Sequence, residues 1–272
     1  MSKLKCNYHT HTNYSDGKNS PEEMIKKAIE IGFTRLGFSE HSSCCIYNGE
    51  RLNYDAYFDE MFALKEKYKN QIEIYVGIEQ DTYASKYDKR SEYIIGSLHH
   101  LGKEYDYMAI DKSKAYTEEY VSKFFDNDFY KYAKAYYESE SEVVKKTNPN
   151  VIGHFDLLTK FNEGYNEFSE EDPRYLDYAF QSMDALIEYN IPFEMNTGAI
   201  ARGYRKTPYM NPILMKHLFE KGGEIVISSD CHNMDYLDCE FDTCVEIAKS
   251  VGFKYTNILT KDGWIGIPLD TL

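Results

Sequence analysis

Seven apolar runs, most of them followed by His, Asp or Glu and then by a helical pattern, constrain the fold of this chain most strongly. The expected strands cover residues 3–9, 34–38, 72–78, 93–98, 151–153, 191–195 and 224–229. Strands that alternate with helices form a parallel sheet with right-handed crossovers. Seven such units in 272 residues predict an α/β fold whose sheet closes, or nearly closes, into a barrel. We expect residues 1–272 to form a single domain.

The expected helices follow from capping signals and from apolar residues spaced at three and four positions. Ser20, Pro21 and Glu23 form a capping box that starts the first helix, which ends at Gly32. Further helices are expected at residues 54–69, 117–146, 173–190, 211–221 and 239–250. Residues 101–116 have weak periodicity and are expected to pass over the strand ends. A short strand near 253–259 and a tail complete the chain.

The composition excludes several classes of protein. The net charge of −14 argues against a phosphate-neutralising surface for nucleic acid, although a metal cluster can still attract a small phosphorylated substrate. No apolar run approaches the length of a membrane span, and the first residues lack the pattern of a signal peptide. The six cysteines form no paired CxxC framework, which predicts reduced thiols and a cytoplasmic protein. Tyrosine is unusually frequent, with 26 residues, and many of these are expected to line a surface or cleft.

The end of the first expected strand carries a pair of histidines. His9 and His11 are two residues apart, so their imidazoles lie on the same face of a strand. Asp16 adds an oxygen ligand shortly after them, and Gly17 lets the loop turn sharply. Neutral imidazole is the commonest protein ligand for zinc and similar ions. This stretch therefore predicts a metal site.

Histidines and acids recur at the ends of the other expected strands. The full set is His9, His11, Asp16, His41, Glu79, His99, His154, Asp230 and His232. Each of these residues has an ordinary alternative role, such as a helix cap, a core histidine or a surface acid. However, six of the eight histidines lie at strand ends, where the active groups of such barrels gather. We therefore expect these side chains to converge.

The two remaining histidines have different expected roles. His217 lies in the middle of an expected helix and is interpreted as an ordinary surface or packing residue. His100 points away from His99 if the strand continues, so it is either a core residue or a group that supports the site.

Nine clustered ligands exceed the needs of one tetrahedral ion. They suit two or three divalent ions, with Glu79 as a bridge. The high share of histidine favours zinc, iron or manganese over magnesium or calcium. Centres with several ions are typical of hydrolytic phosphoryl transfer, because the ions activate water and neutralise developing charge.

The order of these motifs resembles the polymerase and histidinol phosphatase (PHP) superfamily. HTHTNYSDG, SEH, a strand-final Glu, GSLHH, GHFD and SSDCH follow one another between residues 9 and 232. GHFDLLTKF and PFEMNTGAIARG are similar to the histidinol-phosphatase branch. Glu40 departs from the Asp that many members carry, but it need not be a ligand.

The resemblance implies a distorted seven-stranded, TIM-like (β/α)7 barrel with three divalent metal ions. One ion would be bound by His9, His11, Glu79 and Asp230, a second by Glu79, His99 and His154, and a third by Asp16, His41 and His232.

A phosphate monoester also needs cations other than the metals. Arg202 and Arg205 follow the sixth expected strand, and Lys160 follows the fifth, so all three are candidates for phosphate contact. The family pattern matches Arg202 best. His100 is a further candidate for substrate contact. The acidic residues of the Tyr-rich segment, Glu104, Asp106 and Asp111, are candidates for holding a substrate amine.

The expected function is hydrolysis of L-histidinol phosphate to L-histidinol and phosphate in histidine biosynthesis. Glu79 would bridge metals, and Asp230 or His232 would pass a proton to the leaving alkoxide. The alternatives are a protein-tyrosine phosphatase, a nucleotide phosphodiesterase or exonuclease, and a metal-binding scaffold without turnover. We expect no nucleic-acid or membrane partner, and the sequence does not predict the oligomeric state.

Overall fold

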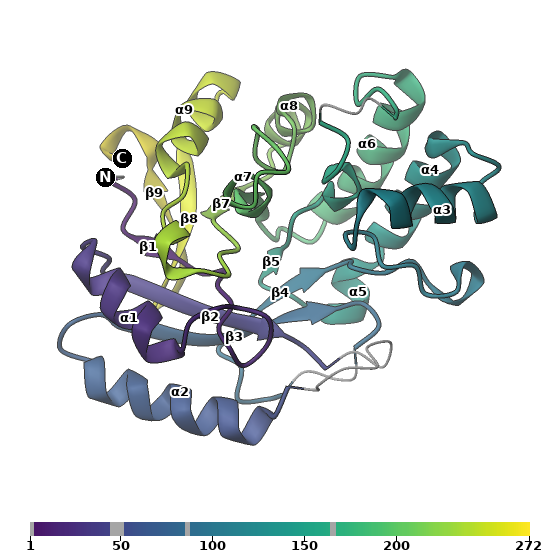
Figure 1. Cartoon of the computed structure of the whole chain (residues 1–272). Coiled ribbons are helices and arrows are strands. Elements are labelled where there is room, and N and C mark those ends of the chain that lie inside the picture. The colour runs from purple at the N-terminus through teal and green to yellow at the C-terminus, as the bar shows by residue number, and fades with distance from the viewer. Residues whose placement is uncertain (1–2, 44–51, 85–87, 164–166) are drawn as a thin grey trace.

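The computed structural model describes residues 3–43, 52–84, 88–163 and 167–272. Its main feature is a seven-stranded sheet in which each strand pairs in parallel with the next one along the chain. The strands are β1 (Cys6–Asn7), β2 (Arg35–His41), β3 (Glu73–Asp81), β4 (Tyr93–Ser97), β5 (Val151–Ile152), β6 (Phe193–Asn196) and β7 (Ile225–Ser228). The sheet curls into a nearly closed barrel with helices around its outside (Figure 1), which confirms the predicted fold.

The barrel closes through contacts just beyond the ends of β1 and β7. Thr10 forms a parallel bridge with Cys231. The N–H of His11 donates to the carbonyl of Cys231 at 2.9 Å, and the N–H of Cys231 donates to the carbonyl of His9 at 3.3 Å. The two segments that carry the first and last candidate ligands therefore lie side by side, although more than 200 residues separate them along the chain.

The helices largely agree with the sequence prediction. They are α1 (Pro21–Glu30), α2 (Tyr54–Tyr68), α3 (Lys114–Phe124), α4 (Phe129–Glu140), α5 (Val143–Thr147), α6 (Pro173–Ile187), α7 (Gly198–Ala201), α8 (Pro212–Glu220) and α9 (Phe241–Val251). The predicted capping box of α1 is present: Ser20 Oγ accepts from Glu23 N, and Glu23 Oε2 accepts from Ser20 N at 2.8 Å.

The prediction of one helix over residues 117–146 is wrong, because three helices occupy this region. Asp126 and Asn127 adopt left-handed backbone angles, with φ of 55° and 60°, which end α3 and its turn. The Asp128 side chain then caps α4 by accepting from the backbone N–H groups of Tyr130 and Lys131. Short polar side chains tolerate left-handed angles and favour caps. The run Asp126-Asn127-Asp128 therefore carried the missed signal.

The two ends of the chain also differ from expectation. The first strand pairs only over Cys6–Asn7 instead of residues 3–9, because the chain turns toward the end of β7 from His9 onward. The expected tail instead forms a second strand. β8 (Tyr255–Thr260) and β9 (Gly263–Pro268) make an antiparallel hairpin that lies beside β7.

Tyrosine contributes to the interior as well as to the surface and the cavity, which Tyr204 and Tyr236 line. The fully buried tyrosines include Tyr8, Tyr57, Tyr93, Tyr132, Tyr136, Tyr137, Tyr175 and Tyr209. The Tyr93 hydroxyl lies 2.6 Å from the carbonyl of Tyr8 and 2.9 Å from the carbonyl of Phe38. Gly77 makes room for its ring, because a Cβ there would lie 2.5 Å from Tyr93 Cε1.

Four cysteines lie in the described part of the chain, and all four are free thiols: Cys6, Cys231, Cys239 and Cys244. Cys44 and Cys45 lie outside the described residues. Among the residues described, no helix combines the length and apolar character needed to cross a membrane.

We expect Gly77→Ala to destabilise the protein, because the added methyl group overlaps the buried ring of Tyr93. Overpacking of this kind costs about 1–3 kcal/mol. Gly266→Ala is the matched control, since a Cβ there meets its nearest atom at 3.5 Å, an ordinary contact. Urea unfolding of both metal-free variants measures the difference. Equal midpoints for the two variants would show that Tyr93 does not need this space.

Candidate metal centre

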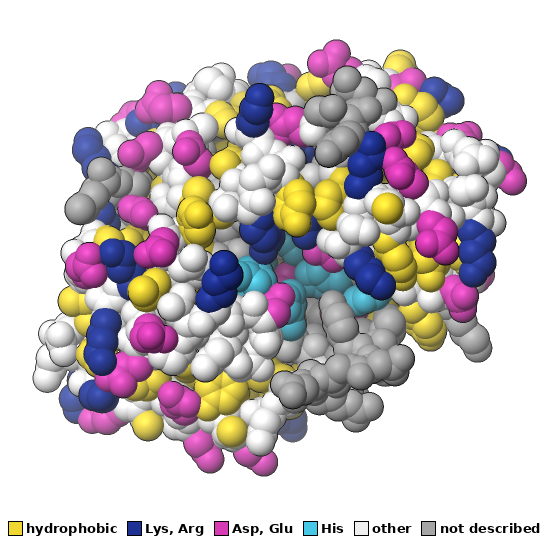
Figure 2. Space-filling view, in the orientation of Figure 1, with side chains coloured by type: hydrophobic (Ala, Val, Ile, Leu, Met, Phe, Trp, Pro, Cys, Tyr) yellow, Lys and Arg dark blue, Asp and Glu magenta, His cyan; other side chains and the backbone are white. Residues whose placement is uncertain are grey.

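All nine predicted ligands gather at the end of the barrel where the strands have their carboxyl termini. His9, His11 and Asp16 follow β1, His41 and Glu79 lie in β2 and β3, and His99, His154, Asp230 and His232 follow β4, β5 and β7. Figure 2 shows the histidines at the bottom of a hollow in this face. The cavity has a volume of about 530 Å³. The structure thus brings together the residues that the sequence placed at separate strand ends.

Strand register explains why two of these residues meet. His41 and Glu79 are direct partners in the β2–β3 ladder, and His41 Nδ1 lies 2.8 Å from Glu79 Oε2. Side chains of paired residues in adjacent strands project on the same face of the sheet. The register therefore positions the imidazole and the carboxylate together before any other contact is considered.

The first group of ligands surrounds one oxygen each of Glu79 and Asp230. His9 Nε2 and His11 Nε2 lie 3.4 and 3.5 Å from Glu79 Oε2. The same two nitrogens lie 3.6 and 3.2 Å from Asp230 Oδ1. His9, His11 and Asp230 thus offer ligand atoms that one ion could reach, and Glu79 Oε2 lies near the same two nitrogens. Imidazole and carboxylate groups are suitable ligands for a divalent transition metal.

The second oxygen of Glu79 faces a different pair of histidines. Glu79 Oε1 lies 2.9 Å from His154 Nε2 and 3.2 Å from His99 Nε2. The two oxygens of one carboxylate therefore serve separate ligand groups. This geometry fits the predicted bridging role of Glu79.

The third group gathers around Asp16. Its Oδ1 lies 3.2 Å from His232 Nε2 and 3.5 Å from His41 Nε2. His11 Nδ1 lies 3.9 Å from the same oxygen, so His11 stands between the first and third groups. His41 likewise faces both Asp16 and Glu79 with its two nitrogens.

Several buried ligand atoms have no hydrogen-bond partner among the described residues, which supports a metal-binding role. They are His9 Nε2, His11 Nδ1, His11 Nε2 and Glu79 Oε2. Buried polar atoms are normally hydrogen-bonded, so a group of unpartnered ones that converge requires an explanation. A cation bound between His9 Nε2, His11 Nε2 and Glu79 Oε2 would give these three atoms a partner.

The electrostatics of the cluster suit this role. Burial, together with the nearby His232 and His41, lowers the pKa of His11 to about 3, so its imidazole is neutral. Burial opposes ionisation of Glu79, yet the surrounding imidazoles hold its pKa well below the usual range. A neutral imidazole and an ionised carboxylate are the forms that bind metals.

Metal binding is expected to displace protons from the cluster. Burial disfavours protonation of His9 and His41, but nearby carboxylates, chiefly Glu194 for His9 and Glu79 for His41, raise the pKa of both imidazoles well above the usual value. A metal ion would take the place of those protons. Affinity for metal therefore falls as the pH falls and the imidazoles become protonated.

Two buried carboxylates orient the ligands, and the sequence analysis missed both of them. Glu194 Oε1 lies 2.6 Å from His9 Nδ1, and its Oε2 accepts the backbone N–H of His154 at 2.8 Å. Asp81 Oδ2 lies 3.2 Å from His99 Nδ1. Carboxylates of this kind fix the tautomer and orientation of a metal-binding imidazole. Glu194 lies in the apolar run of β6, and an acidic residue within that run was the only signal that the sequence offered.

Asp81 also contacts His100, whose role the sequence had left open. His100 is 2 % exposed, and its Nδ1 lies 3.4 Å from Asp81 Oδ2. The lining of the cavity, as far as the structure describes it, does not include His100. The structure therefore places His100 behind the ligands, where it contacts Asp81.

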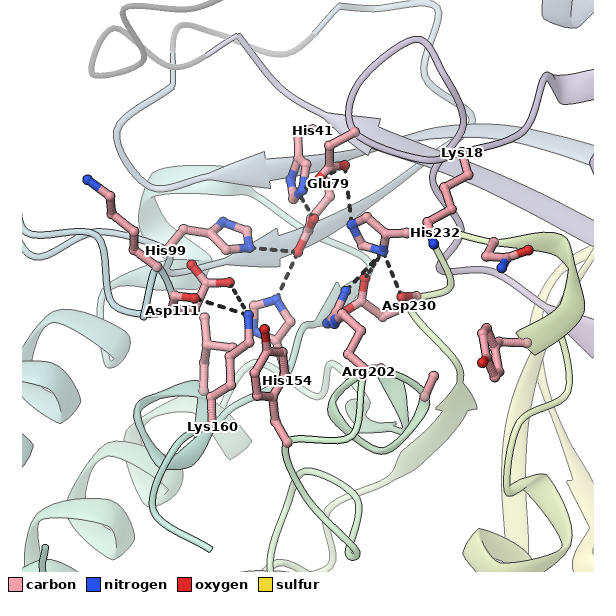
Figure 3. A pocket seen from close by; sticks show the side chains of 18 residues that line it. Lys18, His41, Glu79, His99, Asp111, His154, Lys160, Arg202, Asp230 and His232 are labelled. Atoms are coloured by element: carbon pink, nitrogen blue, oxygen red, sulfur yellow. Dashed lines mark hydrogen bonds and ion pairs between the residues drawn. The ribbon is translucent and has the colours of Figure 1, made fainter. Parts of the chain in front are cut away.

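Arg202 lies at the edge of the metal cluster. Its Nη2 donates to Asp230 Oδ2 at 3.0 Å, and its Nη1 lies 3.0 Å from His232 Nδ1 (Figure 3). Gly198 permits this approach, because a Cβ there would lie 2.7 Å from Asp230 Oδ2 and 2.8 Å from Arg202 Nη2. The guanidinium is thus held beside the ligands and lines the cavity.

Lys160 also lines the cavity, together with two further lysines, Lys18 and Lys112, that the sequence analysis did not select. Lys160 Nζ donates to Asp111 Oδ2 at 2.8 Å. Figure 3 shows Lys160 and Arg202 on the same side of the cavity as His154. With Arg202, these lysines surround the metal cluster with positive charge.

Arg205 lies apart from the other predicted substrate contacts. Its side chain is buried, donates to the carbonyl of Thr159 at 2.9 Å, and pairs with Glu170 at 3.4 Å. It lines a neighbouring surface pocket and not the cavity that contains the histidines. The structure therefore gives Arg205 a role in joining loops.

His217 packs between α8 and α6. Its ring stacks on Phe180 with centroids 3.9 Å apart, and its Nε2 lies 2.7 Å from Asp184 Oδ1. This is the ordinary packing role that its mid-helix position predicts.

Comparison with known proteins places this geometry in a family. The sequence profile of the PHP domain matches residues 7–198. A Schizosaccharomyces pombe protein described as a probable histidinol-phosphatase is 26% identical over 235 residues, which cover 78% of this chain and 74% of that protein.

Two solved structures share the fold. A candidate histidinol phosphatase from Listeria monocytogenes superposes with a TM-score of 0.77 at 21% identity, covering 88% of this chain and 99% of that one. The histidinol phosphate phosphatase of Lactococcus lactis, solved with zinc, L-histidinol and phosphate, gives a TM-score of 0.73 at 20% identity, covering 96% of this chain and 98% of that one. With a domain profile that spans more than half of its length and a ligand set at the carboxyl ends of seven parallel strands, the chain belongs to the PHP-domain family.

Proposed function

We propose that this protein is a metal-dependent phosphomonoesterase that hydrolyses L-histidinol phosphate to L-histidinol and phosphate. The observation that carries the proposal is the Glu79 carboxylate, whose two oxygens face separate groups of imidazoles at the bottom of a cation-lined cavity. The relatives described as histidinol-phosphatases support the choice of substrate. We further propose that the protein acts in the cytoplasm, as its cysteine pattern predicts.

The ligand groups suit three divalent ions, which we propose to be zinc, iron or manganese. The first would be held by His9, His11, Glu79 and Asp230, the second by Glu79, His99 and His154, and the third by Asp16, His41 and His232. When bound, such ions lower the pKa of water and neutralise charge on a phosphoryl group.

The residues of the chain would bind the phosphate and move the proton. The Arg202 guanidinium would bind non-bridging phosphate oxygens, since it already lies at the edge of the cluster. His232 Nδ1 lies 3.0 Å from the carbonyl of Asp230. Its Nε2 lies 3.2 Å from Asp16 Oδ1. We propose that His232 or Asp230 passes a proton to the leaving alkoxide.

The direct test is phosphate release from a panel of monoesters and diesters, after reconstitution with zinc, iron or manganese. We expect the highest kcat/KM for L-histidinol phosphate. Preference for diesters would favour a nuclease-like role, and preference for phosphotyrosine peptides a protein phosphatase.

The metal-loaded protein should carry more than one transition-metal ion per chain. Of the substitutions in the ligands, Glu79→Gln should cause the largest loss of bound metal, because one change weakens two ligand groups together. Elemental analysis measures the ion content of both proteins. The matched control is Glu220→Gln, an exposed glutamate on α8 that pairs with Lys216. One ion or fewer in the wild-type protein contradicts the three-ion proposal, and full content in Glu79→Gln contradicts the bridge.

His154→Ala should nearly abolish turnover, whereas His217→Ala should keep it close to wild type. His154 Nε2 lies 2.9 Å from the Glu79 carboxylate, while His217 packs between two helices on the outside of the barrel. His217→Ala should instead lower the thermal midpoint through lost stacking on Phe180. Equal effects of the two changes on kcat would remove the distinction between strand-end and mid-helix histidines.

Arg202→Ala should lower kcat/KM by about 10²–10³, the usual loss for one charge-assisted contact to a developing negative charge. Arg202→Lys should recover only part of this, because a lysine lacks the planar fork of donors. Metal content should be kept, since Arg202 bonds Asp230 Oδ2 and the histidines face Oδ1.

The comparison variant for Arg202 is Arg205→Ala. Arg205 pairs with Glu170 outside the cavity, so its loss should reduce stability more than catalysis. Steady-state kinetics on L-histidinol phosphate decide between the two arginines. A loss under about threefold for Arg202→Ala rejects its phosphate contact.

A further inference from the structure

The cavity contains one carboxylate that the metal ligand groups do not use. Its acidic lining residues, within the described part of the chain, are Asp16, Glu79, Asp111 and Asp230. Asp16, Glu79 and Asp230 belong to the metal cluster. Asp111 remains, on the wall beside Lys160 and near His154 and His99 (Figure 3).

Asp111 is held in this place by backbone pairing with the end of β4. Ala109 forms an antiparallel bridge with His100, and the N–H of Ile110 donates to the carbonyl of His99 at 2.9 Å. Asp111 is the next residue, so the chain that carries it is anchored to a metal ligand. The position of its carboxylate relative to the cluster is therefore fixed by main-chain hydrogen bonds.

The Asp111 side chain has one oxygen in use and one available. Lys160 Nζ donates to Asp111 Oδ2 at 2.8 Å and to its backbone carbonyl at 3.1 Å. Oδ1 accepts no hydrogen bond from the residues that the structure describes, and the side chain is 31% exposed. Although burial opposes ionisation, Lys160 and His99 lower the pKa of Asp111 to about 2, so the group is a carboxylate at neutral pH.

Among the described residues that line the cavity, Asp111 is the carboxylate best placed to receive a substrate cation. Lys18, Lys112, Lys160 and Arg202 line it and would repel an ammonium group. The metal-cluster carboxylates are committed to their imidazoles and to the ions proposed above. An ammonium group that leaves water needs a carboxylate partner, because burying an unpaired charge is costly.

We propose that Asp111 forms the binding subsite for a substrate ammonium group, and that it selects phosphate monoesters of 2-amino alcohols. This inference rests on the proposed function. In such an ester the amine is on the carbon next to the one that bears the ester oxygen, so it must bind close to the metal-bound phosphate. Asp111 Oδ1 receives the ammonium group, while Lys160 stays on Oδ2 and faces the cavity.

The test compares two esters in two proteins. One ester is L-histidinol phosphate, and the other is its deamino analogue, in which hydrogen replaces the ammonium group. Asp111→Asn should lower kcat/KM for the first ester by about 10- to 100-fold, the value of a hydrogen bond between charged groups. The change for the analogue should stay under about threefold. Any effect transmitted through Lys160 acts on both esters and cancels in their ratio.

The matched control is Asp106→Asn. Asp106 lies on the same segment, but its side chain is 72% exposed and pairs with Lys123 at 3.3 Å. Its substitution should leave the ratio of the two esters unchanged.

Two results would overturn the subsite. An equal loss on both esters would show that Asp111 acts only by holding Lys160, and no loss on either would show that it does not contact the substrate. Release of phosphate from neither ester by the wild-type protein would reject the proposed function instead. Calorimetric titration with both esters then decides the subsite separately: tighter binding of the amino ester that Asp111→Asn removes supports it, and equal affinities overturn it.

Discussion

The Glu79 carboxylate is the group on which the rest of the centre depends. It is 1 % exposed and has imidazole nitrogens between 2.8 and 3.5 Å away on both of its oxygens. A lone carboxylate at this depth would be strongly disfavoured, because it loses its hydration. The ring of imidazoles compensates for this loss, and the same arrangement presents the lone pairs that bind divalent ions. The same imidazoles therefore stabilise the buried carboxylate and supply nitrogen ligands for metal ions.

The parallel sheet turns a dispersed set of residues into a compact cluster. All seven strands run in the same direction, so residues that follow apolar runs far apart in the sequence meet at one end of the barrel. The β2–β3 register pairs His41 with Glu79, and the bridge from Thr10 to Cys231 joins the first ligand segment to the last. Behind this layer, Glu194 contacts the ring of His9 and the backbone of His154, so it ties together segments that follow different strands.

Local charge and net charge have opposite signs in this molecule. The chain has a net charge of −14, yet four cationic side chains of the described residues line the cavity of the metal cluster. Short-range contacts in a partly desolvated cavity outweigh distant surface charges that salt screens. The net charge of the chain therefore does not describe the immediate surroundings of the metal cluster.

The sequence by itself determined the fold class and identified the residues that gather at the candidate metal centre. The alternation of apolar runs with helical patterns predicted seven parallel strands, and His9, His11, Glu79 and Asp230 were each identifiable as polar residues at a strand end. Such signals are local, because hydrophobic period and residue type need no knowledge of distant partners. Their meeting point followed from one general property of parallel barrels.

Only the tertiary structure decided which of the remaining residues contribute to the site. Arg202 and Arg205 are three positions apart and chemically identical, yet one lies beside Asp230 while the other pairs with Glu170 outside the cavity. No sequence pattern marked Glu194 as a group that supports the site. Asp111 was one of three acidic residues in an irregular segment. These roles depend on the direction of single side chains and on contacts between residues far apart in the chain. Neither is encoded in local periodicity, and both are set by the closure of the barrel and by the loops that pack over its end.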